Sequence, residues 1–432
     1  MDNMKPLNPI QKTVVGVQFL FVAFGATVLV PLLVGLDPST ALFTAGIGTL
    51  IFHLVTKGKV PIFLGSSFAF VAPIIKATEL YGLPGTMSGL VAVGTVYGLM
   101  SLLVRWRGIG FIKRLFPPVV IGPVIILIGL SLAGSGVNMA KENWPLALVA
   151  LLSAILASML GRGMLRLIPI FCGIIVGYLT ASLFGLIDFK PVIEAPWFAF
   201  PQFVKPSLSW EAVIFMIPVT IAPVIEHIGD VYAINEVTGK DFVKDPGLHR
   251  TLIGDGLATS LSALVGGPAN TTYGENTGVL ELSKVHDPKV IRIAALYAII
   301  LSFIPKIAEV IGSMPSAIIG GVSFMLYGMI SAIGVRNVVE NHVDFTKSRN
   351  LIIAGVIFVS ALGFSNGLTF TVAGTDITLT SLAIAAIAGI LLNAILPGND
   401  YHFGKDVEAD SNRGIDMMPN LHEDTSYGDH EE

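Results

Sequence analysis

The chain has 432 residues, of which 53% are hydrophobic and 13% charged, and its mean hydropathy is +0.77. Soluble domains carry about 25% charged residues, so half that share excludes a soluble multidomain enzyme, and apolar runs of about 20 residues predict an all-α polytopic membrane protein. The single cysteine, Cys172, excludes an intramolecular disulfide, and the formal net charge of −4 excludes no class of function.

About fourteen apolar segments follow a polar N-terminal segment, 1–13. We expect seven spans at about 14–34, 39–56, 60–78, 85–104, 117–136, 145–161 and 165–187. A loop rich in Pro, Phe and Trp, 188–209, precedes seven more at about 210–235, 251–266, 268–283, 289–311, 315–334, 349–368 and 378–396. The remainder, 397–432, has nine acidic and two basic residues from Lys405 onward, which predicts a disordered tail.

The positions of Lys and Arg predict the orientation of these spans. With the N-terminus inside, 21 of the 26 Lys and Arg residues fall in inside segments and five in outside segments. A wrong span count would scramble this bias. We therefore expect both termini in the cytoplasm and the loop 188–209 outside the cell, in a cytoplasmic (inner) membrane.

Two pairs of segments are similar at a separation of seven spans. "PPVVIGPVIILIG" from Pro117 matches "PSAIIGGVSFMLYG" from Pro315, and "GSSFAF" from Gly65 matches "NTTYGE" from Asn270. Because seven is odd, the two halves, 14–187 and 210–396, would lie in the membrane with opposite orientation. This is the inverted repeat typical of secondary transporters, whose substrate site lies near the membrane midplane.

The third and tenth spans contain short polar stretches, "LGSSFAF" and "GGPANTTYGENTG", that do not suit a lipid-facing helix. Non-helical backbone at this depth is tolerated only where protein or a cavity surrounds it. We expect each to be broken into a short extended stretch and a half-helix, whose N-terminus presents backbone N–H groups to a ligand.

Four carboxylates lie away from the span ends, where a charge costs about 2.5–3.5 kcal/mol or more. Glu226 and Asp230 are four residues apart and share a helix face, so the pair is our candidate for proton binding. Glu275 lies in the broken tenth span and is a candidate for substrate binding. Asp255 is expected to cap or pack, and His227 is expected to be structural.

Other candidate site residues surround Glu275. Phe68 and Tyr273 occupy matching places in the two halves and could enclose a flat ring between them, although core packing explains them as well. Asn276 could orient a ligand or serve in packing. Tyr327 interrupts the apolar run of the twelfth span and could face the site from the other domain.

The stretches "GSSFAFVAP", "EHIGD", "DPGLHR" and "NTTYGENTGV" resemble the nucleobase–ascorbate transporter family. Its signature reads here as Asn276, Thr277, Gly278, four residues, Ser283 and Lys284. The resemblance extends from about Gln11 to Pro397. It implies fourteen spans as a seven-plus-seven inverted repeat, a core and a gate domain, proton-coupled uptake of a nucleobase, and dimers.

The resemblance also implies roles for individual residues. Glu226 and Glu275 match substrate-binding carboxylates, and Glu275 is similar to the uracil carriers of the family, whereas glutamine there would resemble the xanthine and urate carriers. Phe68 and Gly274 match positions that present backbone N–H groups, and Tyr273 matches an aromatic residue packed on the base.

Two departures from the family pattern concern the proton pathway. Many relatives carry Gln-His where this chain has Gln18-Phe19, and a bacterial uracil carrier has histidine where Asp230 stands. We therefore expect a proton-coupled uracil carrier in which the coupling group, Glu226 with or without Asp230, needs a direct test.

Other functions remain open to test. The nearest alternative is a xanthine or urate symporter, and a less favoured one is an anion transporter of the same architecture, against which Glu275 argues. The chain lacks HExxH, GxSxG and phosphate-binding loop motifs, so we expect no enzyme, no cofactor, no metal and no nucleic-acid partner.

Overall fold

The computed structural model describes residues 8–108, 110, 114–364, 367–372 and 375–398. Nearly the whole of the predicted tail, 397–432, and most of the predicted N-terminal segment, 1–13, lie outside these ranges. The described part is mostly helical, with two short pairs of strands.

The α-helices in chain order are α1 (Pro9–Val34), α2 (Pro38–Val55), α3 (Val71–Arg107), α5 (Pro118–Ala140), α6 (Trp144–Leu160), α7 (Pro169–Leu183), α8 (Lys190–Glu194), α9 (Trp210–Met216), α10 (Ile221–Thr238), α11 (Leu248–Leu264), α12 (Glu275–Ser283), α13 (Pro288–Ser302), α14 (Pro305–Gly312), α15 (Ser316–Glu340), α16 (Ser348–Gly363) and α17 (Ser381–Ile395). Four short helical turns are η1 (Phe68–Phe70), η2 (Gly163–Leu167), η3 (Pro218–Thr220) and η4 (Val243–Gly247). The strands are β1 (Leu64–Ser66), β2 (Asn270–Thr272), β3 (Leu368–Val372) and β4 (Thr375–Leu379).

Several helices begin at a side-chain cap followed by proline. Asn8, Asp37 and Asp287 precede the first residues of α1, α2 and α13, and each accepts hydrogen bonds from backbone N–H groups of the first turn. Proline suits the first helical position because its missing N–H would have no partner there and its φ is already helical. These local signals fix where the helices start, independently of their apolar surfaces.

Five helices are long and apolar enough to cross a membrane within the part of the chain that was searched. They are α1, α2, the helix that runs through η1 and α3, α5 and α15; α13 and α14, bent by 81° at a short break, together make a sixth. Five shorter apolar helices accompany them. The chain is therefore a multi-pass membrane protein, while the count of fourteen spans stays a prediction.

The third and fourth predicted spans meet in one helix, α3, which is bent at Gly82. Its backbone angles, φ 71° and ψ 163°, belong to neither helix nor strand, and Pro84 follows two residues later. A residue with a side chain is strained at this φ, so glycine permits the bend. The two segments are thus separated by a change of direction and not by a loop.

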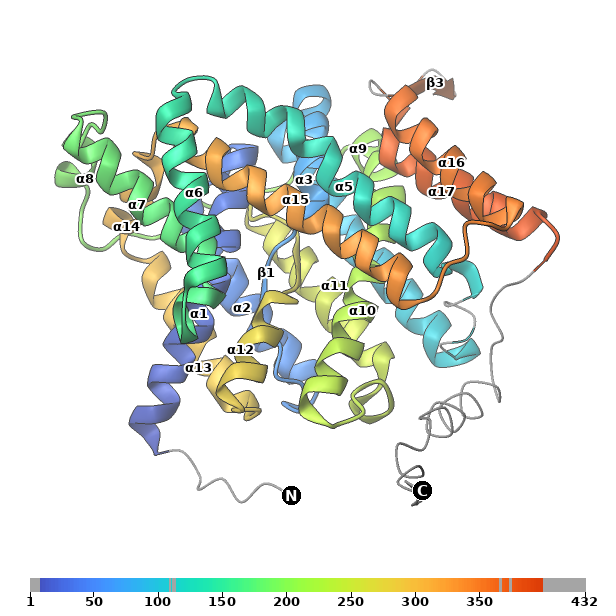
Figure 1. The fold of residues 1–432 in the computed structure, drawn as a ribbon, viewed down its shortest axis with the longest axis horizontal. Helices are drawn as coiled ribbons and strands as arrows, with labels where there is room; N and C mark the ends of the chain where they lie inside the picture. The colour runs from blue at the N-terminus through green and yellow to red at the C-terminus, as the bar shows by residue number, and fades with distance from the viewer. Residues whose placement is uncertain (1–7, 109, 111–113, 365–366, 373–374, 399–432) are drawn as a thin grey trace, which may run out of the picture.

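Two long helices, α5 and α15, run side by side across the upper part of Figure 1, and α16 and α17 pack together beside α5. Glycines bring the two backbones together: a Cβ added at Gly129 would lie 2.3 Å from the carbonyl oxygen of Tyr327, and one at Gly320 would lie 2.4 Å from the backbone nitrogen of Ala140. Ser331 also donates a hydrogen bond to the carbonyl of Ile126, at 3.0 Å. Such close contact makes this pair one packed unit.

The hairpin of β3 and β4 was not expected from the sequence. It pairs Leu368 with Leu379 and continues to Val372 opposite Thr375, in a region predicted to be the end of one span, a loop and the start of the next span at 378. The helix α16 correspondingly ends at Gly363, before the predicted end of that span at 368.

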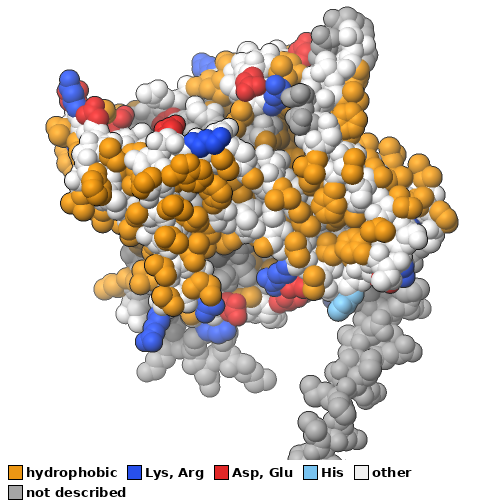
Figure 2. Space-filling model, turned by 45° about the horizontal axis from the view of Figure 1, so that its top comes forward, with side chains coloured by type: hydrophobic (Ala, Val, Ile, Leu, Met, Phe, Trp, Pro, Cys, Tyr) orange, Lys and Arg blue, Asp and Glu red, His pale blue; other side chains and the backbone are white. Residues whose placement is uncertain are grey.

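Hydrophobic side chains form a broad band across the face shown in Figure 2, and charged side chains gather above and below it. Many large apolar side chains are exposed, among them Leu183, Met159 and Leu102 at 87%, 75% and 62%. Lipid would cover such a band, so the surface fits a protein embedded in a bilayer.

Candidate functional site

Strands from the two halves of the chain pass each other in the interior. In β1 and β2, Leu64, Gly65 and Ser66 pair antiparallel with Thr272, Thr271 and Asn270. Both strands are fully buried. Two further hydrogen bonds extend the pairing, from the N–H of Ser67 to the carbonyl of Ala269 at 2.9 Å and from the N–H of Tyr273 to the carbonyl of Phe63 at 3.2 Å.

Each strand leads within two residues into a helical segment. The turn η1 begins at Phe68 after β1 and continues into α3, and α12 begins at Glu275 after β2. Neither start is capped by a side chain. Because the first N–H groups of a helix have no partner within it, these two starts have hydrogen-bonding capacity for a ligand.

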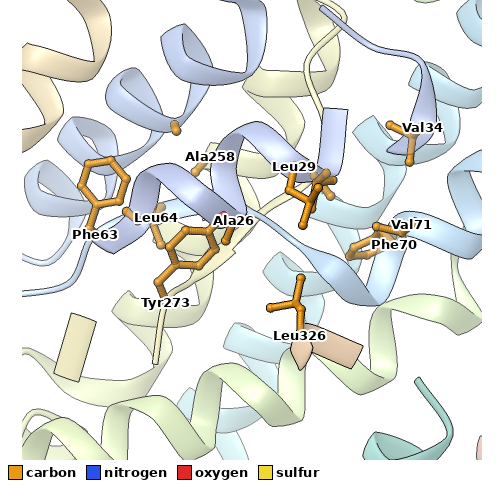
Figure 3. Packing of buried hydrophobic residues seen from close by; sticks show 14 of the residues in the cluster. Ala26, Leu29, Val34, Phe63, Leu64, Phe70, Val71, Ala258, Tyr273 and Leu326 are labelled. Carbon is orange, nitrogen blue, oxygen red and sulfur yellow. The ribbon is translucent and has the colours of Figure 1, made fainter. Parts of the chain in front are cut away.

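Tyr273 holds the crossing strands together. Its hydroxyl donates to the carbonyl of Ser66 at 3.0 Å and accepts from the hydroxyl of Thr27 on α1 at 3.3 Å. The ring packs on Gly65, where a Cβ would lie 2.5 Å from the ring carbon Cζ. Figure 3 shows Tyr273 next to Leu64 and Ala26. Only 4% of Tyr273 is exposed, so most of the ring is committed to this packing.

The carboxylates of α10 lie beside the start of α12. Glu226 is exposed, whereas Asp230 is half-buried and accepts a hydrogen bond from the hydroxyl of Thr272 at 2.7 Å. The Asp230 carboxyl also lies beside Gly274, where an added Cβ would be 2.8 Å from Oδ1 of Asp230. The two carboxylates that the sequence paired, Glu226 and Asp230, therefore have different surroundings. Thr272, which bonds to Asp230, is a site residue that the sequence did not indicate.

Asn276 and Glu275 are the first residues of α12. The side chain of Asn276 is 1% exposed, and neither atom of its amide has a hydrogen-bond partner among the residues that the structure describes. A buried amide without partners is costly, so it favours a ligand or water beside it. The backbone of Glu275 is placed, while its side chain lies outside the described part.

Phe68 and Tyr327 belong to different elements, η1 and α15. Phe68 is half-buried at the start of η1 and packs against the main core cluster. Tyr327 is buried in α15, with its ring against Gly136 of α5, and lines a hollow of about 150 Å³ between these two helices. The structure thus brings Asp230, Gly274 and Asn276 together at the start of α12, with Glu226 one helical turn before Asp230 on α10, while Tyr273 and Tyr327 are largely engaged in packing.

A second polar cluster lies in the core behind β2. The imidazole Nδ1 of His227 on α10 is 3.5 Å from the carboxylate of Asp255 on α11, and both side chains are 0% exposed. The sequence suggested a structural role for His227 and a packing role for Asp255, but it did not indicate that they meet. In the described ranges, no three His, Cys, Asp or Glu side chains gather closely enough to hold a metal ion.

Outside the spans, an ion pair joins the segment after α2 to η4, the turn that follows α10. The ammonium group of Lys59 donates to the carboxylate of Asp245 at 2.6 Å. This hydrogen bond holds the pKa of the Asp245 carboxyl below its usual value. Both side chains are largely solvent-accessible, so the pair contributes little to stability.

Comparison with known proteins identifies the family. Residues 10–370 match the sequence model described as "Permease family". The chain is 47% identical over 396 residues to the "Uracil permease" of Bacillus caldolyticus, covering 88% of this chain and 91% of that protein. It is 45% identical to the "Probable uracil permease" of Pasteurella multocida, covering 90% and 94%, and 38% identical to the "Uracil permease" of Escherichia coli, covering 90% and 92%.

Solved structures show the same fold at low sequence identity. The transmembrane domain of the cyanobacterial bicarbonate transporter BicA has a TM-score of 0.60 at 13% identity, covering 90% of this chain and 98% of that one. The murine anion transporter Slc26a9, in its inward-facing state, has a TM-score of 0.65 at 12% identity, covering 91% and 69%. These likenesses concern the fold alone.

The match over most of the chain and the relatives at 38–47% identity agree with the motifs around Glu226 and Glu275. These relatives are permeases, which move solutes and do not transform them, so the chain is a transport protein and not an enzyme. The chain belongs to the permease family that includes the uracil permeases.

Proposed function

We propose that the chain carries uracil into the cell together with a proton. The observation that supports this most is the pairing of β1 with β2, each of which leads into a helix start without a side-chain cap. Asp230 and the buried amide of Asn276 lie at the start of α12. The relatives named as uracil permeases supply the substrate class.

The chemistry of uracil suits these groups. Its ring offers N–H donors and carbonyl acceptors in alternation along one edge. Carboxylates such as Glu226 and Glu275 accept hydrogen bonds from ring N–H groups, and the backbone N–H groups at Phe68 and Gly274 donate to ring carbonyls. In the same site, Asn276 orients the ligand and Phe68 supplies an aromatic face. Tyr273 and Tyr327 line the site. A site built on such bonds rejects molecules that leave them unmade.

The proposed architecture is fourteen spans in two inverted halves, with a core domain that carries β1, β2 and α10 and a gate domain that includes α5 and α15. The core moves against the gate, which exposes the site to each side of the membrane in turn. Both termini lie in the cytoplasm, as the distribution of Lys and Arg predicts, and the membrane is the cytoplasmic one. A homodimer is a further part of the proposal.

Glu226, with or without Asp230, is the proposed proton carrier, and no cofactor other than H⁺ is involved. The driving force is sufficient, because one charge crossing 100 mV supplies about 2.3 kcal/mol, or roughly 50-fold accumulation of the substrate.

Competition binding tests the substrate. Purified protein should bind radiolabelled uracil, and unlabelled uracil should displace it at much lower concentration than xanthine or urate does. Displacement by xanthine or urate at equal or lower concentration would make the chain a purine symporter. Anion currents without uracil binding would favour an anion transporter, the activity of the proteins that share its fold.

A further inference from the structure

The hydrogen bond between Thr272 and Asp230 joins two elements that are far apart in the sequence. The hydroxyl Oγ1 of Thr272, on β2, lies 2.7 Å from the carboxylate Oδ2 of Asp230, on α10. Thr272 is 2% exposed and its backbone is paired with Leu64, so this hydroxyl is held on a fixed strand. A hydrogen bond from a fixed donor to a charged acceptor sets where the carboxylate lies.

The other carboxylate oxygen of Asp230, Oδ1, lies close to Gly274. A Cβ added to Gly274 would lie 2.8 Å from Oδ1 of Asp230, with the carboxyl carbon at 3.6 Å. Gly274 is the residue that precedes α12. The carboxyl therefore lies directly against the backbone from which the proposed ligand-binding N–H groups extend, and it cannot move away without breaking the bond to Thr272.

We propose that Thr272 is a positioning residue: it holds the Asp230 carboxyl against the start of α12, so that gain or loss of a proton at Asp230 changes how well this helix start binds a ligand carbonyl. A carboxylate is favourable beside the positive end of a helix, and it competes there with a carbonyl for the same N–H groups. Protonation of Asp230 removes its negative charge and leaves the helix start to the ligand. This rests on the proposed function, because the carbonyl is that of uracil.

Asp230 is one of several ionisable groups on α10 and on the elements packed against this helix. The helix contacts α5, α11, α12, β2, η3 and η4. Of these, α5, β2 and η3 carry no ionisable side chain. The ionisable side chains on α10 and on the remaining three elements are Glu226, His227, Asp230, Tyr232, Glu236, Lys244, Asp245, His249, Arg250, Asp255, Glu275 and Glu281. Among them, Asp255 pairs with His227, and Asp245 pairs with Lys59.

The test compares three variants of the full chain in proteoliposomes. Thr272→Val removes the hydroxyl and keeps the shape, Thr272→Ser keeps the hydroxyl, and Thr271→Val removes a hydroxyl from the opposite face of the same strand. Uracil uptake is measured from pH 5 to 9 at constant membrane potential, and the melting temperature of each purified protein is measured over the same range.

For Thr272→Val, we expect the pH of half-maximal uptake to rise by about one unit, since the hydrogen bond that stabilises the charged carboxylate is lost. Above that pH, the uracil concentration for half-maximal uptake should fall by up to about tenfold relative to wild type, because Asp230 then keeps its proton more often. Thr272→Ser and Thr271→Val should keep the wild-type pH profile. In an Asp230→Asn background, Thr272→Val should shift the profile no further. The deficit in melting temperature of Thr272→Val should grow as the carboxylate ionises.

Two results would overturn this role of Thr272. One is a wild-type pH profile for Thr272→Val in both uptake and melting. The other is equal loss in Thr272→Val and Thr272→Ser, which would show that the hydroxyl is not what matters. A wild-type protein that does not transport uracil, yet whose melting shows the pH-dependent deficit, would overturn the proposed substrate and the link to uracil while keeping the placement of Asp230.

Discussion

Substituting Gly65 by alanine tests whether the crossing strands are packed as the structure places them. An added Cβ would lie 2.5 and 2.6 Å from ring carbons Cζ and Cε2 of Tyr273 and 2.7 Å from the hydroxyl of Thr27. Real Cβ atoms do not come this close to other atoms. The Tyr273 ring must therefore move, and its hydrogen bond to the carbonyl of Ser66 must weaken or break.

The size of the effect follows from two contributions. Overpacking a buried site costs about 1–3 kcal/mol. Leaving the buried carbonyl of Ser66 without its hydroxyl partner costs about 1–3 kcal/mol more. We therefore expect Gly65→Ala to lower the free energy of unfolding by about 2–6 kcal/mol, measured in mixed micelles by titration with a denaturing detergent.

A double-mutant cycle separates this contact from a general intolerance of β1. Tyr273→Leu removes the two ring carbons that the new Cβ would strike and the hydroxyl that bonds to Ser66, so Gly65→Ala should cost about 1–3 kcal/mol less in that background. The remaining cost comes from the hydroxyl of Thr27, at 2.7 Å. Strictly additive effects of the two substitutions would refute the packing of Tyr273 on Gly65.

Three further substitutions probe other contacts. Asp255→Ala should lower the free energy of unfolding by about 1–3 kcal/mol, because it leaves the buried imidazole of His227 without its polar neighbour; equal stability would contradict the contact. The pKa of Asp245 is lowered by Lys59, so this pair stabilises the fold above about pH 4 and ceases to do so as pH falls through the depressed pKa. Asp245→Asn should thus lower the melting temperature slightly at pH 7, since the pair is largely solvent-accessible, but not at pH 2.5; an equal effect at both would be inconsistent with the ion pair. Lys306→Ala removes hydrogen bonds of 2.8 and 3.0 Å to two carbonyls of the 188–209 loop, and it should speed proteolysis of that loop, whereas an unchanged cleavage rate would mean that the loop is held elsewhere.

Apolar periodicity and the motifs predicted the family, the transport function and the places of the strands. Extended backbone was expected in the segments that hold β1 and β2, because their small hydroxyl residues and glycines do not suit a lipid-facing helix. The pairing of these two strands with each other could not be predicted, since the paired residues lie 204 to 208 positions apart in the sequence and meet only through the packing of the two halves.

Side-chain partners were harder to predict than backbone elements. The spacing of Glu226 and Asp230 put them on one helix face, but the sequence cannot show that Asp230 reaches across to Thr272 or that Tyr273 turns its ring onto Gly65. The hairpin of β3 and β4 was missed for a different reason. Its polar and apolar residues alternate as strands require, yet they were assigned to a span end and a loop because apolar length was the criterion.

The central claim is that the chain couples uracil entry to proton entry. The most direct measurement is uptake of radiolabelled uracil by proteoliposomes with and without an inward proton gradient, beside a Glu275→Gln variant of verified folding. The account predicts uptake that the gradient stimulates and that the variant loses. Absence of uracil uptake by folded wild-type protein would contradict the substrate, and uptake that is indifferent to the gradient would contradict the coupling to protons.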